Sequence, residues 1–493
     1  MRTTRLLATL IALTLVLIPT SLSAVQPRLT IVVVVDGMTQ ENLTKLRPYW
    51  SAGGLRTLSE EAFQTTIAFP HLVNGGQETV ATLMTGTTPS HHGIMGDNSF
   101  SRNYRTIYPI LNDPNAAGIG TTLQLSPQAI STTTITDEWR IQQGTDAKIY
   151  AIVLQQQATI LMAGHAANAC CWLDHHSLKW VTTSSYSEGL PTAADAMNIS
   201  ERINDIANRS WTPRLDISMY TSPTKDERRR LFNYLPNKCI LQTPAANTLV
   251  VELALNMQKT EKLGEDMTPD LLLLQLTTLS PKAESDAIQS AEQEDMYLNI
   301  NQDLGYLMEQ LDHRIGKTNY QIMLVGRPIK GHSVQMYETA GITIQHFNID
   351  RAAALTSTYL MAIYGHERWV DGGYGSFIYL NRTLIEQKRL SLETIQRQVA
   401  NFLMDFEGVQ VAYPIHEAIR SEYATSIHRK QAGDVFFLLQ DHWIMDTNEQ
   451  TRYDHVIEQN PTAPLMLWSP NMRTFPSAQI NATDVKSLII NHK

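Results

Sequence analysis

Leu29-Thr-Ile-Val-Val-Val-Val-Asp36 is the stretch that decides the fold of this 493-residue chain. A nearly unbroken run of β-branched residues, apolar on both faces, is typical of a strand buried between two layers of helices. In open α/β sheets ligands bind beyond the carboxyl ends of the strands, so Asp36 lies where a functional site is expected. The alternative role for Asp36 is an ordinary cap of the helix that follows.

A second group of motifs follows this strand. It comprises Phe69-Pro70, Asn74-Gly-Gly-Gln-Glu-Thr-Val-Ala-Thr-Leu-Met-Thr-Gly-Thr-Thr-Pro89 and His91-His-Gly-Ile-Met-Gly-Asp-Asn98. Together with the strand that ends in Asp36-Gly37, this pattern resembles the alkaline phosphatase superfamily. Within it the pattern is similar to the phosphodiesterase/nucleotide pyrophosphatase-like branch, which includes periplasmic phosphate-irrepressible alkaline phosphatases. The resemblance implies an α/β fold with a mostly parallel central sheet, helices on both faces and cap insertions.

The N-terminus has the pattern of a cleavable signal peptide. Arg2 and Arg5 precede an apolar run, and small residues end it at Ala24. The apolar run is too short to span a bilayer, and the alternative is a buried N-terminal helix. Residues 1–24 therefore predict a periplasmic or secreted protein. Residues 25–493 are expected to form one alkaline-phosphatase-like domain, with a polar, cap-like insertion at about 190–240.

Charge and cysteine content exclude several classes of partner and site. The formal net charge is -9, which argues against nucleic acid or an anionic membrane as the partner. No segment after the signal peptide is long and apolar enough to be transmembrane. Cys170, Cys171 and Cys239 lack the spacing of zinc ligands. Either one of the adjacent pair bridges to Cys239, or all three are buried thiols.

The resemblance implies a nucleophilic Thr or Ser at the N-terminus of the helix that begins near Gln77. There the free N–H groups and the helix dipole hold a phosphoryl group. The matching position, ten residues before Gly86, is Gly76, which has no hydroxyl. Thr79 is the available substitute, and its alternative role is that of an ordinary residue of the first helical turn.

The phosphate-contacting positions of the family are also changed. A family Asn aligns with Asp97, next to Asn98, and a carboxylate there would repel a phosphate dianion. A Lys and an Arg that bind phosphate in the family align with Gln155 and Gln157, upstream of a structural His165. Loss of both cations removes the main charge stabilisation of a phosphoryl transition state.

The resemblance further implies two zinc ions held by six side chains, of which only Asp36 is retained. The other ligand positions hold Ser280, Glu284, Arg327, Pro328 and Tyr453, the last of these close to His455. Zinc sites in proteins need about four N, O or S ligands in fixed geometry, so one carboxylate does not retain the metal.

Arg327 places a positive charge where a zinc ion would lie. Two unit charges ~4 Å apart interact by roughly 4 kcal/mol at an effective dielectric constant of 20, and a divalent ion doubles this. That energy opposes a metal but attracts Asp36. We therefore predict that the Arg327 guanidinium replaces the metal and lies within roughly 6 Å of Asp36, the range of a close charge pair.

These substitutions predict a pseudoenzyme that needs no cofactor and binds an envelope protein or a small ligand. The alternative is a metal-dependent phosphoric ester hydrolase with a rearranged two-zinc site, for which Thr79, Asp36, Glu284, His332 and His455 are available. A third hypothesis, sulfatase-like or phosphoglycerate-mutase-like activity, is disfavoured because no Cys or Ser occupies the nucleophile position.

Overall fold

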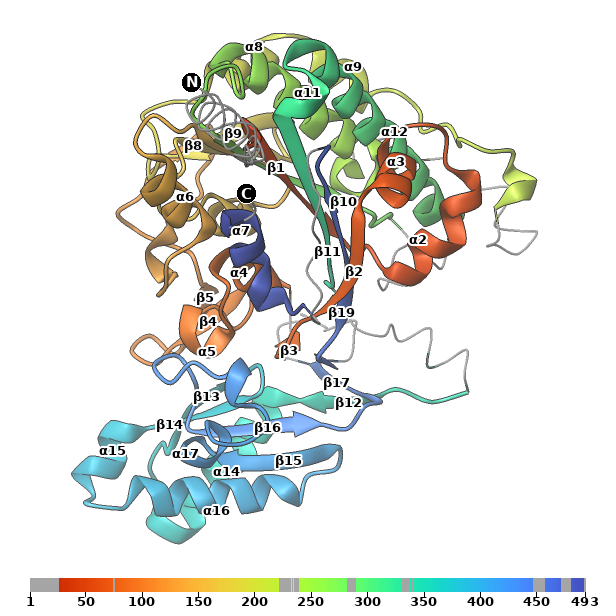
Figure 1. The fold of residues 1–493 in the computed structure, drawn as a ribbon. Coiled ribbons are helices and arrows are strands. Elements are labelled where there is room, and N and C mark those ends of the chain that lie inside the picture. Colours follow the sequence, from red (N-terminus) through yellow and green to blue (C-terminus); the bar gives the residue numbers. More distant parts are fainter. Residues whose placement is uncertain are drawn as a thin grey trace, which may run out of the picture.

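The structure is a computed structural model. It describes residues 26–73, 76–220, 232, 234, 239–281, 290–329, 337, 341–446, 457–470 and 480–491. The expected signal peptide lies outside this range, as do Glu284, His332, Tyr453 and His455. In the described part, a large α/β unit lies above a smaller one that is formed by the later part of the chain (Figure 1).

The main sheet has nine strands within the described residues. Their order is β2 (Phe63–Ala68), β19 (Thr462–Trp468), β11 (Tyr320–Arg327), β1 (Leu29–Asp36), β10 (Asp270–Thr277), β7 (Ile149–Val153), β8 (Ala169–Asp174), β9 (Lys179–Thr183) and β6 (Gly118–Ile119). The five strands from β11 to β8 are parallel, and β19 and β9 run in the opposite direction. The expected α/β fold with a mostly parallel sheet is confirmed.

β1 is the central strand, and every one of its residues is buried. Leu29, Ile31, Val33 and Val35 belong to the core formed with α3 (Gly54–Glu61), α8 (Thr192–Ile199), α9 (Arg202–Ala207), α11 (Pro244–Glu261) and α12 (Ala291–Arg314). Val32 and Val34 belong to the opposite core, with α4 (Gln77–Thr85), α6 (Ile135–Gln143), α7 (Gln156–Ala163) and α18 (Val485–Asn491). Because both faces are covered, each such side chain contributes roughly 1.5–3 kcal/mol.

The smaller unit has its own sheet and core. Its sheet order is β13 (Val370–Tyr374), β14 (Phe377–Leu380), β16 (Val435–Leu439) and β15 (Val409–Pro414). It also contains β12 (Gln345–Asn348), α14 (Ile349–Tyr364), α15 (Arg382–Gln387), α16 (Leu392–Met404), α17 (Ile415–Ala418) and β17 (Trp443–Asp446). Arg102 Nη1 donates to the buried Asp434 Oδ2 over 2.8 Å and ties this sheet to the hairpin β4 (Asn98–Ser101)–β5 (Thr106–Pro109).

Three expectations from the sequence concern the insertion, the cysteines and membrane-spanning helices. The described part of the 190–240 insertion carries α8 and α9, which pack on α11. Cys170 and Cys171 are buried free thiols, so neither bridges to Cys239. Among the residues that the structure describes, no helix combines the length and apolar character needed to cross a bilayer.

Four short helices and strands have not yet been placed. They are α2 (Gln40–Leu46), β3 (Leu72–Val73), α5 (Pro89–His92) and β18 (Glu458–Gln459).

Candidate functional site

The candidate site lies at the carboxyl ends of β1, β10 and β11. Asp36 and Arg327 are register partners at the ends of adjacent parallel strands. Val34 is the register partner of Gln275 on β10, and two residues separate Asp36 from Val34. Side chains two residues apart point to the same face of a sheet, so Asp36, Arg327 and Gln275 all face the layer that contains α4.

Asp36 and Arg327 form a buried ion pair. Arg327 Nε donates to Asp36 Oδ1 over 2.7 Å, and the side chains are 2% and 0% exposed for Asp36 and Arg327, respectively. The pairing predicted from the sequence is confirmed. Two further guanidinium contacts are Nη1 to Gly76 O at 2.6 Å and Nη2 to Gln155 Oε1 at 3.4 Å. Burial alone would lower the pKa of Arg327. The nearby carboxylates, Asp36 foremost, outweigh the effect of burial and raise that pKa.

Gln275 completes the surroundings of Asp36, and reasoning from the sequence missed it. Its Nε2 donates to Asp36 Oδ2 over 2.8 Å. Its Oε1 accepts the backbone N–H groups of Leu154 and Gln155, each over 3.1 Å. Both carboxylate oxygens of Asp36 are therefore engaged by protein donors. The sequence did contain a signal for Gln275, because it is the one polar residue in the otherwise apolar run Leu271-Leu-Leu-Leu-Gln-Leu276.

Gly76 lies at the position where a nucleophile was expected, and the Arg327 guanidinium takes the space that a side chain there would need. Gly76 caps the N-terminus of α4 with a φ of 93°. A Cβ atom at Gly76 would lie 2.8 Å from Arg327 Nη1. Thr79 is fully buried, and its hydroxyl donates to Gly76 O over 2.5 Å. This geometry agrees with the first-turn role of Thr79, because that hydroxyl stabilises the helix start.

The three positions that the resemblance aligns with phosphate-contacting residues carry acceptors and no cationic donors. Burial raises the pKa of Asp97 to about 7; Glu78 adds to this shift, whereas Arg327 and the backbone N–H of Gln77 oppose it. Asp97 Oδ1 and Gln157 Oε1 are buried with no hydrogen-bond partner. Gln155 accepts from Arg327. These positions lack the cationic side chains that would hold a phosphate dianion.

The raised pKa of Asp97 predicts a pH-dependent effect of Asp97→Asn. A carboxyl whose pKa is raised on folding binds more protons in the native state, so its contribution to stability falls as pH rises from about 4 to about 7. In a chelating buffer, the variant should match the wild type near pH 4 and become progressively more stable than it up to about pH 7. Urea unfolding across this range measures the difference, and a difference independent of pH would contradict the assignment.

The described residues do not fit a pair of zinc ions. Ser280 is buried with its Oγ 3.4 Å from Ser290 Oγ, and Pro328 offers no side-chain ligand. In the part of the chain that the structure covers, no group of three or more His, Cys, Asp or Glu side chains is placed to hold a metal. The Arg327 cation directly contacts Asp36, the residue that the resemblance to the family leaves as a zinc-ligand position.

A cleft of about 360 Å³ opens beside Asp36. Its walls are mixed in character and include Leu154, Gln155, His175, Ile240, Gln242 and Leu279. Pockets of this size and composition hold small ligands through apolar contact and a few polar groups. Sequence reasoning did not identify His175, Ile240 or Gln242, since a turn after β8 and a short 3-10 helix at Ile240–Gln242 meet only in the folded chain.

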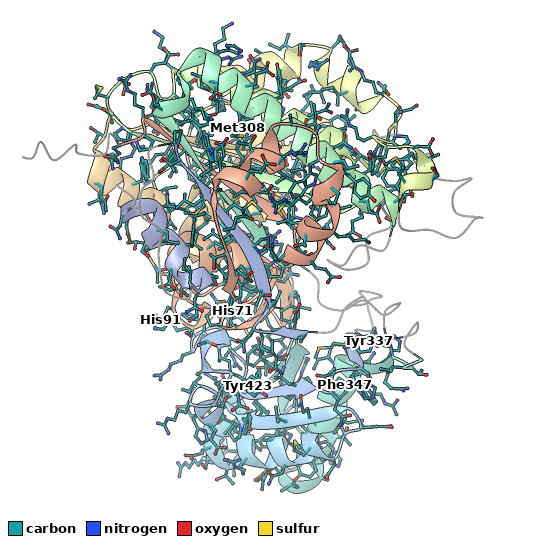
Figure 2. All side chains as sticks on the ribbon, turned by 45° about the vertical axis from the view of Figure 1, so that its right-hand side comes forward. His71, His91, Met308, Tyr337, Phe347 and Tyr423 are labelled. Carbon is teal, nitrogen blue, oxygen red and sulfur yellow. The ribbon has the colours of Figure 1, made fainter. Side chains whose placement is uncertain are left out.

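Two buried histidines contact α4 through the side chain of Thr82. Thr82 Oγ1 lies 2.9 Å from His71 Nε2 and 3.2 Å from His92 Nε2. Burial lowers the pKa of both imidazoles, so they are neutral near pH 7. Figure 2 shows His71 and His91 at the end of the large unit that faces the smaller one, which carries Phe347 and Tyr423. His71 and His92 thus hold α4 through the hydroxyl of Thr82.

Comparisons with known proteins agree with this architecture. The model of the family described as "Type I phosphodiesterase / nucleotide pyrophosphatase" matches residues 30–460. Alkaline phosphatase PafA of Elizabethkingia meningoseptica is 23% identical over 85% of this chain and 82% of its own length. Alkaline phosphatase PhoV of Synechococcus elongatus is 24% identical over 85% and 81%. The crystal structure of wild-type PafA superposes with a TM-score of 0.81 at 21% identity, covering 94% of this chain and 96% of that one.

Proposed function

Since this chain belongs to the type I phosphodiesterase / nucleotide pyrophosphatase family, we propose that it keeps the fold of that family and has lost phosphoryl-transfer catalysis. It acts as a pseudoenzyme that binds a small ligand or an envelope protein. The observation that carries the proposal is the buried ion pair of Asp36 with Arg327, whose guanidinium also occupies the nucleophile position through Gly76 O.

The ion pair opposes catalysis in two ways. Arg327 neutralises Asp36, the retained zinc-ligand position, and its guanidinium would repel a metal bound directly at Asp36 by several kcal/mol. The guanidinium also leaves no room for a side chain at Gly76, the position where phosphoryl transfer would need a hydroxyl. The cleft beside Asp36 remains open and supplies a surface for a ligand.

The N-terminal pattern of residues 1–24 and the acidic composition indicate where such a protein works. We expect secretion or export to the periplasm, and a partner that is neither nucleic acid nor an anionic membrane surface.

A second candidate is a metal-dependent phosphoric ester hydrolase with a rearranged site. It is favoured by the relatives PafA and PhoV, which are named alkaline phosphatases. In that case Glu284, His332 and His455 would join Asp36 and Thr79 around two zinc ions.

One experiment separates these two functions. We expect the purified full chain to hold far less than one zinc ion per molecule and to leave an aryl phosphate monoester and diester unhydrolysed. Asp36→Asn is the matched control, because any contaminating activity persists in it unchanged. Stoichiometric zinc, together with hydrolysis that a chelator and Asp36→Asn both abolish, would establish the hydrolase instead.

A further inference from the structure

Three buried side-chain oxygens around the first turn of α4 lack a hydrogen-bond partner. They are Gln77 Oε1, Asp97 Oδ1 and Gln157 Oε1. Gln77 is only 5% exposed. Leaving a buried acceptor unpaired costs roughly 1–3 kcal/mol, so three such atoms in one region call for a donor or a cation.

Printed contacts tie these side chains into one cluster. Gln77 Nε2 donates to Gln155 Oε1 over 3.4 Å. Gln155 caps the start of α7 and precedes Gln157 by two residues. The carboxyl of Asp97 accepts the backbone N–H of Gln77. Helices α4 and α7 also pack against each other. Gln77 thus contacts Asp97 in the loop between α5 and β4, and it contacts Gln155 at the start of α7.

The orientation of the Gln77 amide follows from its neighbours. Gln155 Oε1 also accepts from Arg327 Nη2, so the atom that faces Gln77 is an oxygen. Gln77 must then offer its nitrogen to that oxygen, and its own oxygen points elsewhere. The unpaired atom is an acceptor.

The charges in this region favour a divalent cation. Arg327 is compensated by direct contact with Asp36. Glu78 and Asp97 remain as two carboxyl groups near α4, and both lie close enough to Arg327 to raise its pKa. Above its pKa of about 7, the Asp97 carboxyl adds a negative charge that the Asp36–Arg327 pair does not neutralise by direct contact.

We propose that this acceptor cluster, Gln77, Asp97 and Gln157 with Glu78 beside it, binds Ca²⁺. Carboxylate and amide oxygens are the ligands that Ca²⁺ prefers, and Ca²⁺ tolerates irregular geometry completed by water, whereas Mg²⁺ requires a near-ideal octahedron. Zinc favours nitrogen and sulfur ligands, which the cluster lacks. None of these residues occupies a zinc-ligand position of the family. The proposal is also independent of whether catalysis has been lost.

The test uses the full chain, stripped with a chelator and held at about pH 8, above the pKa of Asp97. Calorimetric titration with CaCl₂ should give saturable binding of one ion, with MgCl₂ and NaCl much weaker. Asp97→Asn and Gln157→Leu should each weaken Ca²⁺ binding by at least about tenfold. Asp205→Asn, which removes an exposed carboxylate of α9, should bind as the wild type does.

Several results would overturn the proposal. These are no heat and no rise in melting temperature at millimolar Ca²⁺, or binding that Asp97→Asn and Gln157→Leu leave unchanged. Tighter binding of Mg²⁺ than of Ca²⁺ would also contradict it. If Asp97→Asn does not fold, Gln157→Leu alone decides, because it changes no charge. None of these outcomes touches the zinc and hydrolysis measurements, so the proposed loss of catalysis stands or falls separately.

Discussion

Arg327→Met is expected to destabilise the protein by roughly 3–5 kcal/mol, the usual cost of removing one partner of a buried ion pair. The variant leaves the 2% exposed Asp36 carboxyl without its guanidinium partner, and Gln275 is then its remaining side-chain donor in the described part of the chain. It also leaves the carbonyl of Gly76 without its guanidinium donor. Urea-induced unfolding of the full chain measures the loss.

Two further variants identify the cause of that loss. In the double variant Asp36→Asn/Arg327→Met the unpaired charge is gone, so most of the stability should return. Arg56→Met is the matched surface control, because its partner Glu60 is about as exposed as Arg56 itself, at 51% and 49%. An exposed pair contributes about 0–1 kcal/mol. Similar losses for Arg327→Met and Arg56→Met would refute the buried-pair assignment.

Gly76→Thr, which restores a hydroxyl at the nucleophile position, is expected to cost about 3 kcal/mol or more and to yield no hydrolysis. The φ of 93° at Gly76 disfavours a β-branched residue by roughly 1–2 kcal/mol. The new Cβ would also lie 2.8 Å from Arg327 Nη1. A flexible side chain could move away, but this guanidinium is held by Asp36, so the contact strains the ion pair.

The same substitution in an Arg327→Met background separates the two contributions. There the new Cβ no longer meets a guanidinium 2.8 Å away, whereas the φ of 93° at position 76 is unchanged. Gly76→Thr should therefore cost less stability in that background than in the wild type, because only the backbone cost remains. If the two costs are equal, the contact with Arg327 has no energetic weight. A hydrolytic Gly76→Thr variant would show that the metal site is intact and would contradict the proposed loss of catalysis.

Both predictions follow from a site whose substitutions depend on each other. Arg327 needs a glycine at position 76, because any side chain there meets its Nη1 atom. Asp36 in turn needs Arg327 for charge compensation. Restoring one family residue at a time is therefore expected to remove stability.

Much of the main unit was predictable because its signals are local. The strand predicted to end at Asp36 is β1, the strand predicted at 270–277 is β10, and the helix expected to begin near Gln77 is α4. Long apolar runs and a helix start after a glycine pair carry this information in consecutive residues. The four-stranded sheet of the smaller unit was not predicted as a separate sheet, because strand signals do not state which strands pair.

The sequence by itself determined the family, the buried central strand and the pairing of Asp36 with Arg327, since two strand-end residues of opposite charge in known motifs leave few arrangements. Only the tertiary structure decided how that pair is completed. Gln275 on β10, the carbonyl of Gly76 and the unpaired oxygens of Gln77 and Asp97 come together through parallel register and helix packing. Such contacts join residues up to about 250 positions apart, and no local pattern in a chain encodes them.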